Sequence, residues 1–158
     1  MLLKKSFLFL LIILSGLVFF VAASGSKAFR AGMSPDKPWL APKWADTLVG
    51  PNVADPTFVQ NGRKTFVAEC VVCHGEAGRG DGEAGFGLSV PPGDLNDANV
   101  VAESNGSLFW KISNGRSPMP AYNHKYTDSE IWQLVGYIRS MQNQYLLNIE
   151  NKKNRKNK

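Results

Sequence analysis

The chain has 158 residues, enough for one ordinary domain with shorter segments at its ends. Its formal net charge is +5, but the basic residues gather near the two ends, and the part between them is slightly acidic. A nucleic-acid-binding face is therefore not expected. With 2 cysteines and 2 histidines, the chain is neither a four-cysteine zinc ribbon nor a scaffold held by several disulfides.

The first 23 residues contain Lys4 and Lys5, followed by an apolar run over residues 7–23 that ends on the small residues Ala22 and Ala23. This pattern predicts either a cleaved signal peptide or a retained N-terminal membrane anchor over residues 1–23. Both interpretations place the rest of the chain outside the cytoplasm, because the positively charged end stays inside.

Two further segments are expected to lie outside the folded domain. Residues 24–54 contain repeated prolines, which predict a semi-extended spacer. Within it, Trp39 and Trp44 are expected to pack on the domain, with packing on a partner as the alternative. Residues 148–158 mix Asn with Lys and Arg and lack apolar periodicity, so they predict a basic disordered tail.

The segment predicted to fold, residues 55–147, has a helical pattern. An N-cap Asp followed by Pro, with apolar residues at spacings of three and four, predicts a helix over 56–74. A second helix is expected over 107–113, and a capping box at 127–130 begins a third. The G-x-G-x-x-G match at 80–85 lacks a strand before it and a helix after it, so a dinucleotide site is not supported.

One motif carries the chemistry of this chain: Cys70-Val71-Val72-Cys73-His74. In a helix, positions i, i+3 and i+4 share one face, so both thiols and the imidazole point the same way. C-x-x-C-H is the attachment signature for c-type haem, with two thioether bonds and a histidine on the iron. A redox disulfide, a zinc site and a structural disulfide are the weaker alternatives, because the context that each needs is missing.

The second axial ligand is approached by elimination among the methionines and histidines. Met33 lies in the spacer, and Met141 continues the apolar stripe of the last helix, where packing explains it. Met119 lies between Pro118 and Pro120 in a segment that these prolines keep rigid and non-helical. Met119 is therefore the favoured ligand, and His124 or a vacant position remain as alternatives.

With these residues in place, the chain from Asp55 to Tyr145 resembles the class I monohaem cytochrome c family. The resemblance implies an all-α cytochrome c fold, with three to four short helices wrapped around one covalently attached haem. It implies that the terminal helices cross at a small residue, Gly62 with Phe66, facing Trp132 or Tyr137. It also implies that the carbonyl of a proline, Pro91 or Pro92, accepts the proton on the second nitrogen of His74.

The expected function is one-electron transfer by an Fe(III)/Fe(II) haem c with His74 and Met119 as axial ligands, in a periplasmic respiratory chain. The alternative is a fixed haem subunit of a membrane respiratory complex or dehydrogenase. The leader and the resemblance to bacterial members imply the periplasmic side of the inner membrane. Redox proteins are the expected partners, by transient docking or within a complex, with a membrane possible through the N-terminal segment. No catalytic residues and no nucleic acid partner are expected.

Overall fold

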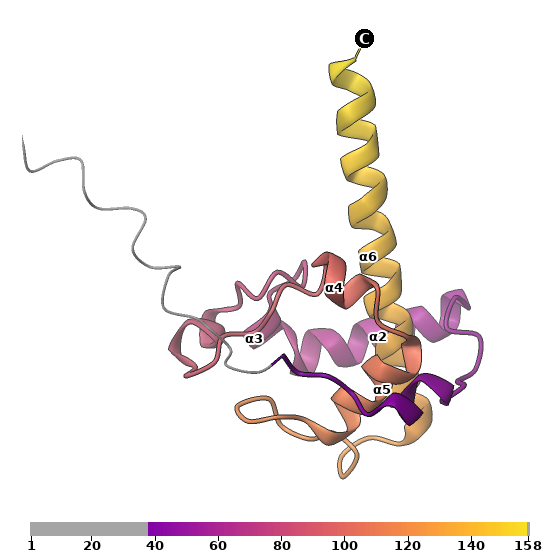
Figure 1. The fold of residues 1–158 in the computed structure, drawn as a ribbon, viewed down its shortest axis with the longest axis vertical. Coiled ribbons are helices and arrows are strands. Elements are labelled where there is room, and N and C mark those ends of the chain that lie inside the picture. The colour runs from indigo at the N-terminus through magenta and orange to yellow at the C-terminus, as the bar shows by residue number, and fades with distance from the viewer. Residues whose placement is uncertain (1–37, 158) are drawn as a thin grey trace, which may run out of the picture. The chain divides into compact units, whose positions relative to one another are not determined.

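The structure, a computed structural model, describes residues 38–157. The predicted leader, residues 1–23, and the first part of the predicted spacer lie outside the described residues. Between residues 38 and 157 the regular elements are helices, and the predicted all-α class is confirmed (Figure 1). In chain order they are η1 (Lys43–Thr47), α2 (Pro56–Glu69), α3 (Val71–His74), η2 (Glu83–Gly87), α4 (Ala98–Val101), α5 (Asn105–Asn114) and α6 (Asp128–Lys156).

Helix α2 begins as its sequence predicts and ends earlier than predicted. The Asp55 side chain caps it by accepting a hydrogen bond from Phe58 N at 2.9 Å, and proline occupies its first turn. The helix stops at Glu69, and the short α3 follows after Cys70, whose φ of −106° departs from helical geometry. The expected single helix over 56–74 is therefore two helices that meet at Cys70.

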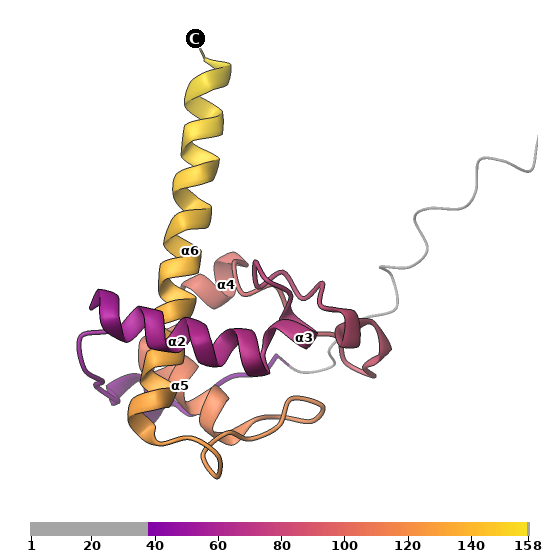
Figure 2. The same ribbon diagram turned by 180° about the vertical axis from the view of Figure 1, so that it is seen from behind.

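The crossing of α2 and α6 holds the two ends of the domain together (Figure 2). A Cβ atom on Gly62 would lie 1.8 Å from the Gln133 carbonyl oxygen, so only glycine allows the two backbones to come this close. Beside it, the buried Phe66 ring lies 5.1 Å from the ring of Tyr137. The predicted small-residue crossing is present, and its aromatic partner is Tyr137, because Trp132 stacks on Phe109 instead.

The expectation of a spacer as far as residue 54 is wrong for the described part of that segment. Ala45 is completely buried, and the Asp46 carboxylate accepts hydrogen bonds from Ser104 and Ser107 at the start of α5, at 2.6 and 2.8 Å. Gly106 permits this contact, because a Cβ there would lie 2.0 Å from the Ala45 carbonyl oxygen. The compact unit therefore begins at Pro38 rather than Asp55. Proline prevents regular structure, but it does not prevent packing.

Helix α6 starts at the predicted capping box and runs further than expected. Thr127 N donates to the Glu130 carboxylate at 2.8 Å, and Glu130 N donates to Thr127 Oγ1. The helix continues to Lys156 and projects from the domain as a single rod (Figure 1). The expectation of a disordered tail from residue 148 is thus wrong through Lys156. The packed first half nucleates the helix, and basic residues in its last turn suit the negative end of the helix dipole.

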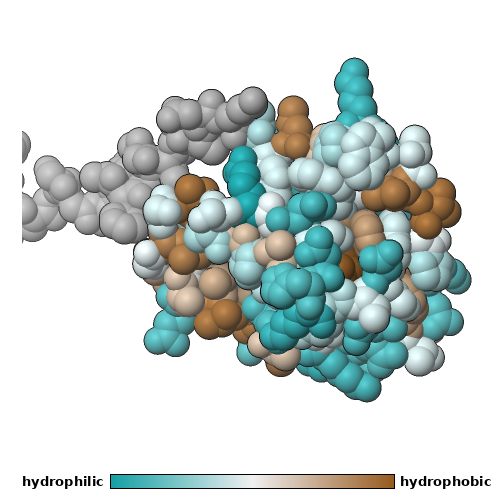
Figure 3. Space-filling model, turned by 90° about the horizontal axis from the view of Figure 1, so that it is seen from below, coloured by the Kyte–Doolittle hydropathy of each residue, from teal (hydrophilic) through white to brown (hydrophobic). Residues whose placement is uncertain are grey.

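The surface of the domain mixes hydrophilic and apolar residues. The face opposite the free end of α6 carries apolar residues in small separate patches among hydrophilic ones (Figure 3). Among residues 38–157, no helix has both the length and the apolar character needed to cross a membrane.

Replacing Gly62 with alanine tests the helix crossing. In an exposed helix this change stabilises by about 1 kcal/mol, but here the added methyl group meets backbone atoms that cannot rotate away. We expect Gly62→Ala to lower the free energy of unfolding by about 3 kcal/mol, measured by denaturant unfolding followed by circular dichroism. The control is Gln60→Ala on the exposed face of α2. A Gly62→Ala protein as stable as this control would contradict the close contact.

The attachment of residues 43–48 should depend on pH through Asp46. Hydrogen bonds from Ser104 and then Ser107 lower the pKa of the Asp46 carboxyl below its ordinary 3.8. The stabilisation is complete above 3.8 and is lost as the pH falls through the lowered pKa. We expect the protection factors for amide hydrogen exchange in residues 43–48, taken relative to the intrinsic rates at each pH, to fall over this acid range. Asp46→Ala should have low protection factors at every pH, and Thr47→Ala should behave as the unaltered chain. Slow exchange in Asp46→Ala at neutral pH would contradict this anchor.

Candidate functional site

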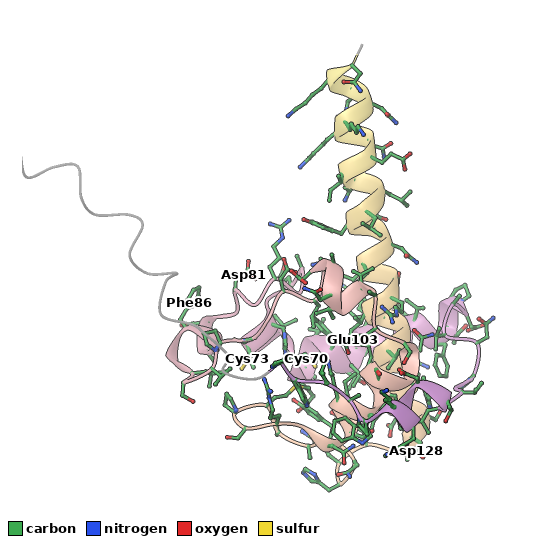
Figure 4. All side chains as sticks on the ribbon, viewed as in Figure 1. Cys70, Cys73, Asp81, Phe86, Glu103 and Asp128 are labelled. Atoms are coloured by element: carbon green, nitrogen blue, oxygen red, sulfur yellow. The ribbon has the colours of Figure 1, made fainter. Side chains whose placement is uncertain are left out.

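The cysteines and histidine of the motif lie at the junction of α2 and α3. The Cys70 carbonyl accepts hydrogen bonds from both Cys73 N, at 3.1 Å, and His74 N, at 2.7 Å, which fixes the turn that connects them. Cys70, Cys73 and His74 all line one cavity of about 180 Å³. Both cysteines are free of disulfides, and Figure 4 shows them close together beside this junction.

A loop from the end of α5 supplies the next part of the wall. Gly115, with a φ of 63°, turns the chain, and a Cβ there would lie 2.4 Å from the backbone of Pro120. Arg116 and Met119 then exchange two backbone hydrogen bonds, at 3.0 and 2.8 Å. This closed loop holds Met119 in the lining of the same cavity as His74.

The cavity continues into a second one of about 160 Å³. Both are lined by Cys70, His74 and Met119, and the second is also bounded by core side chains of α2, α5 and α6, namely Phe66, Leu108, Ile112, Leu134 and Ile138. Together they form one predominantly apolar slot, which we call the slot from here on. The four residues predicted to meet around a cofactor, Cys70, Cys73, His74 and Met119, are thus brought together by the fold.

The loop before α4 forms a further part of the wall. Pro91 and Pro92, the two residues expected to supply the carbonyl for His74, both line the slot, and so does Gly93 after them. Nδ1 of His74 is buried, and among the described residues it has no acceptor within hydrogen-bonding distance. The two prolines stiffen this segment of the wall.

Burial controls the protonation state of the motif. It lowers the pKa of His74, an effect that the Gly93 carbonyl opposes in part, so the ring is neutral near pH 7. Burial, with smaller effects of Glu69 and Cys73, raises the pKa of the Cys70 thiol to about 12. A protonated, buried thiol is a poor nucleophile for disulfide exchange, whereas a neutral imidazole is the form that binds a metal.

The other candidate ligands are arranged differently. His124 is exposed and contributes to neither cavity, and Met141 packs against Gly78 and Leu95 near the core. Met33 lies outside the described residues. Within residues 38–157, no three His, Cys, Asp or Glu side chains gather in a way that could hold a metal ion by themselves. The chemistry of the slot, with two thiols, a neutral imidazole, a thioether and an apolar lining, fits a group that brings its own metal.

Two residues that line the slot, Tyr122 and Trp39, were not predicted as site residues from the sequence. Tyr122 follows Met119 by three positions and is buried against both cavities, where burial raises its pKa to about 12. Trp39 lines both cavities from the segment that was expected to be a spacer. The presence of a tryptophan in a proline-rich segment was the available signal for Trp39, whereas nothing local distinguished Tyr122.

Comparison with known proteins indicates the family of this chain. The family described as cytochrome c oxidase, cbb3-type, subunit III matches residues 57–138, which is more than half of the chain. Cytochrome c6 of Bumilleriopsis filiformis is 26% identical over 91 residues, covering 54% of this chain and 94% of that protein. The cbb3-type cytochrome c oxidase subunit CcoP of Azospirillum sp. (strain B510) is 31% identical over 91 residues, covering 56% of this chain and 30% of that subunit.

A solved structure extends the likeness to the fold. The reducing HAO-like protein complex of Kuenenia stuttgartiensis contains a chain that superimposes with a TM-score of 0.52 at 24% identity, covering 62% of this chain and 54% of that one. At this identity the likeness concerns the fold alone.

The helical fold and the C-x-x-C-H slot define a monohaem c-type cytochrome, an electron-transfer protein with covalently bound haem c. In particular, the chain belongs to the family described as cytochrome c oxidase, cbb3-type, subunit III. It spans about a third of the length of its CcoP relative, while it covers nearly all of the cytochrome c6 relative.

Proposed function

We propose that this chain is a one-electron carrier in which Cys70 and Cys73 hold haem c by thioether bonds and His74 and Met119 are the axial iron ligands. The observation that carries the proposal is the meeting of these four side chains in one apolar slot. When bound, the haem supplies a one-electron Fe(III)/Fe(II) couple.

The protein sets the protonation state, the orientation and the type of the proposed iron ligands. Burial keeps His74 neutral, so no proton has to leave before it binds the iron. Pro91, Pro92 and Gly93 line the same cavity as His74, and a carbonyl of this loop would accept the proton on the second ring nitrogen and orient the imidazole. Met119 offers a thioether, which raises the reduction potential relative to a second nitrogen ligand. The apolar side chains around the slot exclude water and raise the potential further.

With His74 and Met119 both as ligands, no coordination position is left for a substrate, so the chain's role is to pass electrons without making bonds. The likeness to cytochrome c6, nearly the whole of which the chain covers, favours a carrier. The predicted leader assigns this work to the periplasmic side of the bacterial inner membrane.

A fixed subunit of a membrane complex is the second candidate. It is favoured by the likeness to CcoP, a named subunit of a cbb3-type oxidase, and by the projecting end of α6. Exposed Leu146, Leu147 and Ile149 on that projection offer a surface for a permanent partner.

Replacement of Met119 tests the ligand assignment. We expect Met119→Ala to remove the near-infrared sulfur-to-iron charge-transfer band of the oxidised protein. We also expect it to lower the midpoint potential by a fraction of the roughly 0.8 V range that axial ligands span. The measurements are absorption spectroscopy and a redox titration of the purified holoprotein. The matched control is His124→Ala, which should keep the native band. A band that persists in Met119→Ala, or disappears in His124→Ala, would show that the ligand is misassigned.

The mature protein itself separates the carrier from the fixed subunit. For a carrier we expect the purified mature chain to begin at Ser24 and to stay in the supernatant when membranes are sedimented after lysis. N-terminal sequencing, intact mass and sedimentation measure this directly. A chain that retains residues 1–23, or that sediments with a stable set of other subunits, would favour the second candidate.

A further inference from the structure

The part of the chain that precedes the family match reaches the slot. The matched region starts at residue 57, yet Trp39 lines both cavities of the slot. Its position is fixed by the contacts that follow it, because Ala45 is buried and Asp46 is hydrogen-bonded to Ser104 and Ser107. Residues 38–47 are therefore a built part of the wall rather than a passing linker.

Two cations flank the Trp39 ring. Lys111 Nζ lies 5.5 Å from the ring centroid, and Arg116 Cζ lies 5.1 Å from it. Both distances are those of cation–π contacts, which hold long flexible side chains in one place. Lys111 belongs to the last turn of α5 and Arg116 to the loop that carries Met119. The Trp39 ring thus contacts two cations, Lys111 of α5 and Arg116 of the following loop.

These cations mark one side of an otherwise apolar slot. Lys111 lines one cavity and Arg116 the other, and no other Lys or Arg of residues 38–157 lines either of them. Two carboxylates also reach the slot. Glu69 bonds outward to Lys125 and Tyr126, at 2.7 and 3.0 Å. Glu103 pairs with Lys111, while its second oxygen is buried without a partner among the described residues.

We propose that Trp39, Lys111 and Arg116 form the edge of the slot that receives the two carboxylate groups of the haem, so that residues 38–47 complete the cofactor site. This inference rests on the proposed function, because it requires the haem to occupy the slot. Buried carboxylates are costly unless they meet cations, and the slot offers its Lys and Arg at this edge. In this assignment Cys70 and Cys73 would hold the haem through its vinyl groups, and Lys111 and Arg116 would bind its carboxylate groups.

The assignment has a measurable consequence for the redox couple. A cation beside a carboxylate stabilises its ionised form and so lowers the pH at which it titrates. A positive charge near the haem also favours the reduced iron, which carries less positive charge. Removal of Lys111 should therefore lower the midpoint potential at neutral pH. It should also move the carboxylate titration, seen as a bend in a plot of potential against pH, to higher pH.

The test is a redox titration of holoprotein across a range of pH, with covalent haem checked first by intact mass. The variants are Lys111→Gln, the double variant Glu103→Gln with Lys111→Gln, and the control Lys152→Gln on the exposed part of α6. We expect Lys111→Gln to move the bend to higher pH and the control to leave it unchanged. The double variant also removes Glu103 as a titrating group, so a bend that remains in it belongs to the haem carboxylates; its shift should be smaller, because the loss of the Glu103 charge acts in the opposite direction.

Trp39 has its own matched control in the same segment. Trp44 is 58% exposed and lines neither cavity. We expect Trp39→Ala to lower the midpoint potential and move the bend to higher pH. Water would reach this edge of the slot, and Lys111 and Arg116 would lose their cation–π contacts with the ring. Trp44→Ala should match the unaltered protein.

Three results would overturn the inference: Lys111→Gln behaving as Lys152→Gln, no bend in the double variant, or Trp39→Ala behaving as Trp44→Ala. Absence of covalent haem from the unaltered protein would instead refute the proposed function, so the two failures are distinguishable.

Discussion

The close contact of α2 with α6 at Gly62 is the constraint on which the rest of the domain depends. Because backbone meets backbone there, the direction of α2 relative to α6 is fixed, and with it the position of the C-x-x-C-H turn at the end of α2. The same α6 presents Leu134 and Ile138 to the slot and stacks Trp132 on Phe109 of α5. Helix α5 then leads into the loop that holds Met119. One crossing thus positions both parts of the chain that meet around the slot.

Features set by neighbouring residues could be predicted from the sequence. The C-x-x-C-H motif, the capping box at Thr127 and the proline-flanked Met119 each occupy a few consecutive positions, and their chemistry does not depend on distant parts of the chain. The resemblance to class I cytochromes added the crossing at Gly62, which periodicity alone would not have revealed. It left the aromatic partner open between Trp132 and Tyr137, because both lie on α6 and only packing distinguishes them.

Features set by distant contacts could not be predicted. The Asp46 carboxylate accepts a hydrogen bond from Ser107, 61 positions away, and no pattern in the residues near Asp46 predicts that contact. The acceptor for the second nitrogen of His74 was left open between Pro91 and Pro92, because the path of the loop, and not the residue type, decides which carbonyl faces the ring. The helical end of α6 was missed for another reason: it lacks apolar periodicity, and the packed first half of the helix supplies the nucleus from which its Lys, Arg and Glu residues continue the helix.

The loop that carries Met119 has a consequence for the speed of electron transfer. Two backbone hydrogen bonds between Arg116 and Met119 close the loop, and prolines flank the methionine. Gly115 lies in close contact with the backbone of Pro120. When an iron centre gains or loses an electron, the barrier contains the energy needed to rearrange its surroundings. A ligand loop that is already fixed, in a slot lined by apolar side chains, has little to rearrange, as in other preorganised sites. In the proposed site, the stiffness of residues 115–120 thus keeps the reorganisation energy small, so that a brief encounter with a partner is long enough for the electron to cross.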